Sequence, residues 1–246
     1  MTVPSAAKPG GPFPETRYSV LRAAGSPDPE ERRQAFAALA EAYWKPAYKY
    51  ARLRFGLPPA DAEDLTQGFF AEALQKAWFE RFDPARARFR TYLRTCLDGF
   101  ASKARASARA QKRGGGAVHL PLDFASAERE LRDQAGDAAD PEAYFHREWM
   151  RALFERALSR LAAQCAAAGR EAAFEVFRAH DVDADGAPPS YAALAERFAL
   201  PVTQVTNHLS AMRRDLRRHL LACLRELCAS EEEFRQEAQA LLGTPP

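Results

Sequence analysis

The sequence predicts an all-α protein with two small helical domains joined by a flexible linker. Three observations favour this fold class. Apolar residues recur at the helical period along most of the chain, no segment alternates as a β-strand does, and a Gly/Pro-containing stretch interrupts the pattern near the middle. A chain of 246 residues is long enough for one or two domains, and its 47% hydrophobic content is that of an ordinary globular protein.

The composition favours a cytoplasmic protein. No run of about 18 apolar residues is present, so no membrane span is expected. Residues 1–14 lack the apolar core of a secretory signal. The four cysteines form no CxxC pair and lie in helical segments, which predicts buried thiols in a reducing compartment rather than a disulfide framework.

Residues 29–113 are expected to form the first domain. Apolar residues follow Phe36 at i+3, i+4, i+7 and i+8, and this helical pattern ends at the Gly-Leu-Pro-Pro break at 56–59. A second helix opens at Asp61 with acids in its first turn, as the helix dipole favours. A third helix is expected over 88–109.

Two segments outside the domains are rich in helix breakers. Residues 1–28 contain several prolines and glycines and are expected to form a tail. Residues 114–143 open with three glycines and are expected to form the linker, with one short helix at 126–134.

The second domain is expected over 144–225, followed by an acidic C-terminal helix within 226–246. Helical periodicity returns after the linker, and a polar break at 181–189 interrupts it once. The expected helices cover 143–167, 170–180, 190–198 and 202–224.

Charge is segregated along the chain although the formal net charge is only +2. Two basic stretches each precede an acidic one, an arrangement typical of proteins that bind polyanions. Solvated helical faces are the alternative interpretation. The segments are 81–113 with ten basic and two acidic residues, 123–148 with eight acidic and three basic, 208–225 with five Arg and one Asp, and 226–246 with five Glu and one Arg.

Residues 190–216 have the pattern of a helix-turn-helix. Ser190 is a suitable N-cap, Pro201 opens the second helix, and an apolar stripe recurs along that helix from Val205 to Leu216. The opposite face carries residue types that reach base edges and phosphates in a DNA major groove. These are Thr203, Gln204, Thr206, Asn207, Ser210, Arg213 and Arg214.

Basic and aromatic side chains alternate along the third helix. Arg and Lys neutralise backbone phosphates, and exposed aromatic rings stack on unpaired bases, so this helix is a candidate for single-stranded nucleic acid. The alternative places the aromatic rings in the core and leaves only the charges outside. The residues are Arg86, Arg88, Phe89, Arg90, Tyr92, Arg94, Phe100, Lys103 and Arg105.

No motif predicts catalysis, a cofactor or a metal. Residues 181–186 imitate the start of a calcium-binding loop, but Ala192 stands where the bidentate glutamate is required. The histidines lack metal-ligand spacing, and no P-loop, GxSxG or GxGxxG motif is present. The acidic cluster around Asp61 and Asp64 is better explained by dipole compensation or by protein docking.

Three segments together resemble the sigma-70 family of RNA polymerase sigma factors. Asp61-Ala-Glu-Asp-Leu-Thr-Gln-x-Phe-Phe70 resembles the family's polymerase-binding segment, Phe89-Arg-x-Tyr-Leu93 resembles the start of its promoter −10 helix, and 190–216 is similar to its −35-reading region. The order of these segments resembles the extracytoplasmic-function (ECF) type. One subgroup of that type shares the DLTQxFF, Arg-Phe-Arg and Lys-Arg-Gly-Gly-Gly features.

The resemblance implies a non-enzymatic specificity subunit whose partners are core RNA polymerase, at its β′ clamp and β flap, and promoter DNA. It leaves open an anti-sigma factor or another signalling partner. It implies polymerase docking through Asp61, Asp64, Leu65, Gln67 and Phe70, −10 contacts from Arg88, Arg90, Tyr92, Arg94, Lys103 and Arg105, and −35 contacts from the seven residues of the groove-reading face.

Two features depart from the family pattern. Gly99 and Lys103 stand where many members carry Asn and Asp in the −10 helix. The 181–189 insertion and the acidic C-terminal helix are further additions to which the sequence assigns no role, although an acidic appendage can mask a basic groove-reading helix within the same molecule. The alternative function is a dimeric helix-turn-helix repressor or activator that binds duplex DNA alone.

Overall fold

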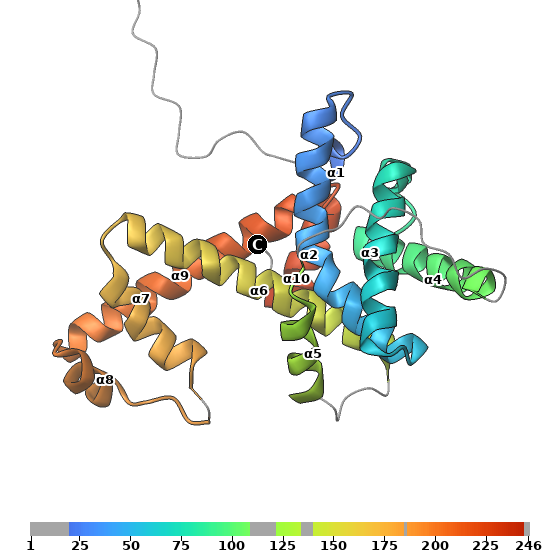
Figure 1. Cartoon of the computed structure of the whole chain (residues 1–246). Helices are drawn as coiled ribbons and strands as arrows, with labels where there is room; N and C mark the ends of the chain where they lie inside the picture. The colour runs from blue at the N-terminus through green and yellow to red at the C-terminus, as the bar shows by residue number, and fades with distance from the viewer. Residues whose placement is uncertain (1–19, 109–121, 134–139, 185, 244–246) are drawn as a thin grey trace, which may run out of the picture.

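The computed structural model describes residues 20–108, 122–133, 140–184 and 186–243 (Figure 1). Every regular element within these residues is helical, which confirms the all-α prediction. The elements are α1 (Val20–Ala23), α2 (Pro29–Phe55), α3 (Pro59–Gln75), the 3-10 turn η1 (Trp78–Arg81), α4 (Phe89–Ala108), α5 (Phe124–Asp133), α6 (Pro141–Ala167), α7 (Glu171–Phe177), the π-helical turn η2 (Arg178–Val182), α8 (Tyr191–Phe198), α9 (Val202–Glu226) and α10 (Glu231–Leu242).

The N-terminal bundle of α2, α3 and α4 has an aromatic core. α2 ends at Gly56, whose φ of +61° is readily adopted by glycine, at the predicted break. The rings of Phe36 and Phe79 stack with centroids 5.4 Å apart, and Tyr43 meets Phe89 edge-on at 5.5 Å. Burial of each Phe side chain stabilises the fold by about 1.5–3 kcal/mol. These rings hold η1 and α4 against α2.

The core of this bundle continues into the C-terminal half of the chain. α6 packs along α2, and α9 packs along α6 (Figure 1). Trp149 and Leu153 of α6, Leu220 and Leu224 of α9, and Phe234 of α10 are all buried in the same cluster as the α2 side chains. The two expected domains therefore share a hydrophobic core.

A second core holds the helix-turn-helix. It is built from the end of α6, from α7 and α8, and from the first half of α9, and it includes Phe177, Leu194 and Leu209. Leu216 contacts both cores. The boundary between the cores thus crosses the long helices α6 and α9 and does not coincide with the expected linker at 114–143.

The helix-turn-helix forms as its local sequence predicts. The Ser190 hydroxyl caps α8 by accepting a hydrogen bond from the Ala193 N–H at 3.2 Å. Ala199 adopts the left-handed conformation (φ +53°) in the turn, and Pro201 precedes the first residue of α9. The turn is closed although alanine occupies the position where glycine is common.

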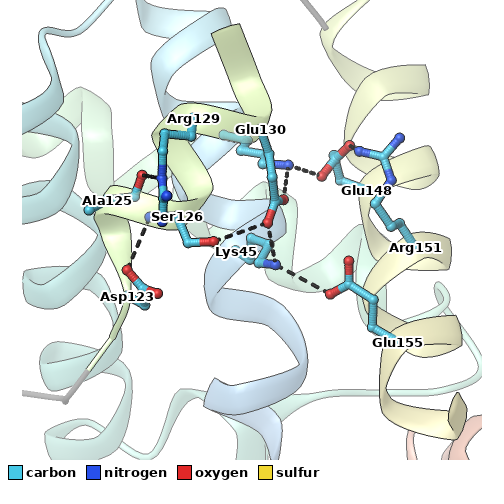
Figure 2. A network of polar contacts seen from close by, with 10 residues as sticks. Lys45, Asp123, Ala125, Ser126, Arg129, Glu130, Glu148, Arg151 and Glu155 are labelled. Carbon is cyan, nitrogen blue, oxygen red and sulfur yellow. Dashed lines mark hydrogen bonds and ion pairs between the residues drawn. The ribbon is translucent and has the colours of Figure 1, made fainter. Parts of the chain in front are cut away.

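The short helix expected within the linker is present as α5, and charged groups bind it to α2. Glu128 pairs with Arg52 at 2.8 Å, and Glu130 pairs with Lys45 at 3.0 Å. Figure 2 shows Glu130 on α5 beside Lys45 on α2. These ion pairs fasten the described part of the expected linker to the N-terminal bundle.

Candidate nucleic-acid interface

The predicted docking segment lies on α3, and its side chains divide between surface and core. Asp61 and Asp64 are exposed, and Gln67 is half-buried. Leu65 and Phe70 are buried, and the Phe70 ring contacts the rings of two other phenylalanines. A partner that approaches this face would meet the two carboxylates first, while Leu65 and Phe70 hold the helix in place from within.

The aromatic side chains of α4 belong mainly to the core. Phe89 is fully buried, and the half-buried Tyr92 ring lies 5.4 Å from the Phe82 ring. The Tyr92 hydroxyl donates a hydrogen bond to the Trp78 carbonyl at 2.7 Å, and burial raises the pKa of Tyr92 to about 12. Of the two interpretations of α4, the one that places the aromatic rings in the core is therefore correct for Phe89 and Tyr92. The outward face of α4 is left with basic side chains.

The arginines in the first half of α4 and just before it are paired with carboxylates from distant helices. Glu237 of α10 accepts from Arg90 at 2.9 Å and lies 3.2 Å from Arg88. Arg94 pairs with Glu142 of α6. Three of the four predicted −10 arginines, Arg88, Arg90 and Arg94, therefore have acidic partners from the same chain.

The second half of α4 presents basic groups in a more open setting. Lys103 and Arg105 are both exposed. The Arg105 guanidinium donates to the Phe55 carbonyl at 2.6 Å and lies over the Phe55 ring at 4.8 Å. The predicted −10 residues at the start of α4 are thus ion-paired, whereas those near its C-terminal end are exposed.

The acidic partners of α4 were not among the sequence-predicted residues. The alternation of basic and acidic stretches along the sequence is consistent with ion pairs between them, but it does not identify which residues pair. The C-terminal helix does not mask the groove-reading face of α9, because the predicted residues of that face are exposed, and Glu233 and Glu237 instead contact Phe89 and Arg90 at the start of α4. Arg90 and Glu237 are 147 residues apart in sequence, so no local pattern could match them.

The predicted groove-reading face of α9 is open. Val205, Leu209 and Met212 are buried in the second core, which turns the opposite face of the helix outward. This geometry is what insertion into a major groove requires. All seven predicted side chains are exposed: Thr203, Gln204, Thr206, Asn207, Ser210, Arg213 and Arg214.

One residue of this face, Arg213, is held by the polar segment that precedes α8. Its Nε and Nη2 donate to the two carboxylate oxygens of Asp181 at 2.7 and 2.8 Å. The hydrogen bonds from Arg213 are the main reason that the pKa of Asp181 is lowered. In the same segment, Asp183 accepts from Arg178 at 2.7 Å. Two carboxylates of the loop that imitates a calcium site are thus bound to arginines.

The described ranges offer neither a metal centre nor a membrane-spanning helix. These ranges contain no group of three or more His, Cys, Asp or Glu side chains that could hold a metal ion. No helix among them is both long and apolar enough to cross a bilayer. Cys165, Cys223 and Cys228 are buried free thiols, as predicted, and Cys96 is half-buried.

The described geometry agrees with one comparison to known proteins. Residues 39–111 match the model of the family Sigma-70 region 2. The match starts within α2, contains α3 and η1, and includes α4, so it covers both the acidic face of α3 and the basic face of α4. No curated protein and no solved structure matches the chain. Residues 39–111 are therefore similar to region 2 of the sigma-70 family.

Proposed function

We propose that this protein is an ECF-type sigma factor that binds core RNA polymerase and directs it to specific promoters. The first domain, 29–113, would dock on the β′ clamp and capture the −10 strand. The second, 144–225, would contact the β flap and read the −35 element as duplex. The chain would add no catalytic group of its own, because the polymerase supplies the active site.

The observation that carries this proposal is the placement of the family match on α2–α4. Within that match, α3 exposes Asp61 and Asp64 while Leu65, Phe69 and Phe70 are buried. A carboxylate pair on a rigid helix suits a protein partner with basic side chains. A stand-alone repressor has no need of such a face.

The second support is the division of nucleic-acid contacts between two separate helices. α4 offers basic groups to a flexible strand, whereas α9 offers a polar face of the shape that enters a duplex groove. α4 packs in the first core, whereas the groove-reading first half of α9 packs in the second. Such an arrangement suits one protein that reads two promoter elements in two forms of DNA.

The test is reconstitution with purified bacterial core RNA polymerase. We expect the full chain to bind core enzyme and to start transcription from promoter DNA selected by the complex. Asp64→Lys should weaken core binding about tenfold, equivalent to ~1.4 kcal/mol. Glu31→Lys is the matched control, since it makes the same charge change at an exposed site in the first turn of α2.

Three outcomes would contradict the proposal. The first is that core polymerase does not bind the protein. The second is that Asp64→Lys and Glu31→Lys weaken binding equally, which would show a general charge effect. The third is that the protein alone binds a palindromic duplex tightly as a dimer, which is the behaviour of a repressor.

A further inference from the structure

The C-terminal helix α10 lies against the start of α4 through two buried carboxylates. Glu233 Oε1 accepts a hydrogen bond from the Phe89 backbone N–H at 2.9 Å, in the first turn of α4. Glu237 Oε1 lies 2.9 Å from Arg90 Nε and 3.2 Å from Arg88 Nη1. Glu237 is 3% exposed and Glu233 8% exposed, so both carboxylates are enclosed by the contact.

The groups that hold these carboxylates would equally hold phosphate oxygens. A helix N-terminus directs N–H groups and a positive dipole end toward an anion, and guanidinium groups bind phosphate and carboxylate in the same geometry. Arg88 and Arg90 are also among the residues that the sequence predicts for the −10 strand. The two glutamates therefore occupy the place that a nucleic-acid backbone would take on this surface.

The anchoring of α10 does not account for the charged contact. Phe234 and Ala238 place the apolar face of α10 in the main core. Buried ion pairs seldom stabilise a fold more than apolar groups of the same size. The groove beside the contact is lined by Arg86 and Arg88 on one side and by Glu232 and Glu233 of α10 on the other. Charge complementarity of this kind is what a surface selected for a polyanion would show when it is covered.

We propose that α10 is an internal competitor, which fills the backbone-phosphate site at the start of α4 so that single-stranded DNA binds only after α10 is displaced. This inference rests on the proposed function in assigning DNA to α4. Displacement would break the contacts of Glu233 and Glu237 with Phe89, Arg88 and Arg90 and would expose Phe234 and Ala238, a cost that DNA binding must offset.

The test measures binding of a fluorescein-labelled 12-nucleotide single-stranded DNA by anisotropy, across a series of salt concentrations. The variant is Glu233→Gln/Glu237→Gln in the full chain, which removes two charges and keeps the side-chain size. We expect about tenfold tighter binding at low salt. The slope of log affinity against log salt should steepen by about 1.4, because two further phosphates would be neutralised on a single strand.

Two controls separate the competitor from simpler effects. Glu30→Gln/Glu31→Gln removes the same charge from exposed carboxylates at the start of α2 and should leave the affinity nearly unchanged. Adding Arg88→Ala/Arg90→Ala to the Glu233→Gln/Glu237→Gln variant should abolish the gain. Circular dichroism and thermal unfolding of each variant establish that the helices remain folded.

The inference is overturned by any of four results. They are an unchanged affinity with a lowered unfolding temperature, an equal gain in the Glu30/Glu31 control, a gain that survives loss of Arg88 and Arg90, or no binding by any variant. The anisotropy assay needs no polymerase. If Glu233→Gln/Glu237→Gln binds single-stranded DNA more tightly but the protein does not bind polymerase, only the sigma-factor proposal is refuted. If the protein directs initiation from promoters but this variant binds DNA no more tightly, only the proposal that α10 is a competitor is refuted.

Discussion

At the residue scale, Lys49 is the least expected side chain of the fold. It lies on α2 with its side chain fully buried, and its ammonium group is 2.5 Å from Glu148 of α6 and 2.8 Å from Glu130 of α5. Arg151 also pairs with Glu148 at 2.7 Å. One buried cation thus joins three helices that are distant in sequence. A lysine next to Tyr48 and Tyr50 gives no sign of this role in the sequence.

Lys49→Met should lower the free energy of unfolding by about 3–5 kcal/mol, because it removes the buried cation between Glu148 and Glu130 and leaves the buried Glu148 carboxylate with the half-exposed Arg151 as its cationic partner. Urea denaturation measures this change. Lys49→Met/Glu148→Leu should recover part of the loss, since it removes both charges. Lys45→Met is the control, and its more exposed side chain should contribute about 1 kcal/mol or less. Equal losses at positions 45 and 49 would contradict the assigned role of Lys49.

The pairing of Arg213 with Asp181 yields a second residue-scale prediction. Asp181→Asn frees the guanidinium and removes a negative charge beside the groove-reading face. Affinity for duplex DNA should rise about threefold at low salt, with a salt slope steeper by about 0.9. Fluorescence anisotropy with a labelled duplex measures both quantities.

Asp183→Asn is the matched control for Asp181→Asn, because Asp183 makes the same charge change but pairs with Arg178. Arg214→Ala should do the reverse of Asp181→Asn and flatten the slope by about 0.9. If Asp181→Asn weakens binding, Asp181 instead orients Arg213 for DNA, and the prediction is wrong.

At the scale of elements, the junction of α4, α6 and α10 contains a histidine whose titration reports on packing. His146 on α6 lies 2.5 Å from Arg90 and stacks on Trp149. Burial, and then the positive charges of Arg90 and Arg88, lower the pKa of His146, while Glu237 acts against them. In the second half of α9, burial and neighbouring arginines likewise lower the pKa of His219.

Stability should therefore fall as the pH drops from about 7 toward 5. A histidine with a lowered folded-state pKa stays neutral in the fold while it gains a proton in the unfolded chain, whose pKa is about 6.5. Protonation thus favours unfolding, by at most about 1.4 kcal/mol per pH unit for each histidine. Urea denaturation at several pH values should show this loss, and His146→Gln/His219→Gln should reduce it.

The carboxylates with a lowered pKa, such as Glu130, take up protons in the unfolded chain only below about pH 4.5. Their effect on stability is therefore separable from that of the histidines. An identical pH dependence in the double variant would refute this assignment.

At the scale of the whole molecule, the long helices α6 and α9 decide how the two cores are related. The 25 residues of α9 span about 37 Å, and they run from the helix-turn-helix to the N-terminal bundle. The groove-reading face is on the first half of this helix, and α10 and α4 are near its end. In this structure α4 and the groove-reading half of α9 are therefore held apart by the packed helices between them.

The shared packing predicts that the described protein unfolds in a single cooperative step. Leu153 of α6 is 2% exposed in the main core, and Leu153→Ala should lower the free energy of unfolding of the whole chain by about 2–5 kcal/mol. Calorimetry should give one transition with equal calorimetric and van't Hoff enthalpies. Two resolved transitions, of which only one moves in Leu153→Ala, would show that the domains are independent.

The local elements were predictable because their determinants are local. Helical periodicity, the glycine break at 56–59, the Ser190 cap and the start of α9 at Val202 all depend on residues within one or two turns of each other. The exposed face of α9 followed from the same periodicity. The π-helical turn η2 was not predicted, since its backbone geometry has no clear signature in side-chain spacing.

The sequence by itself determined the helices, the turn chemistry, the open groove-reading face and the segregation of charge. Only the tertiary structure decided that α6 joins the N-terminal core, that Lys49 is a buried cation, and that α10 covers the start of α4. The reason is physical. Helix formation depends on neighbours a few residues apart, whereas the pairing of helix faces depends on shape and charge matched across large separations. Phe89 and Glu233, 144 residues apart, come into contact only when the whole core is assembled.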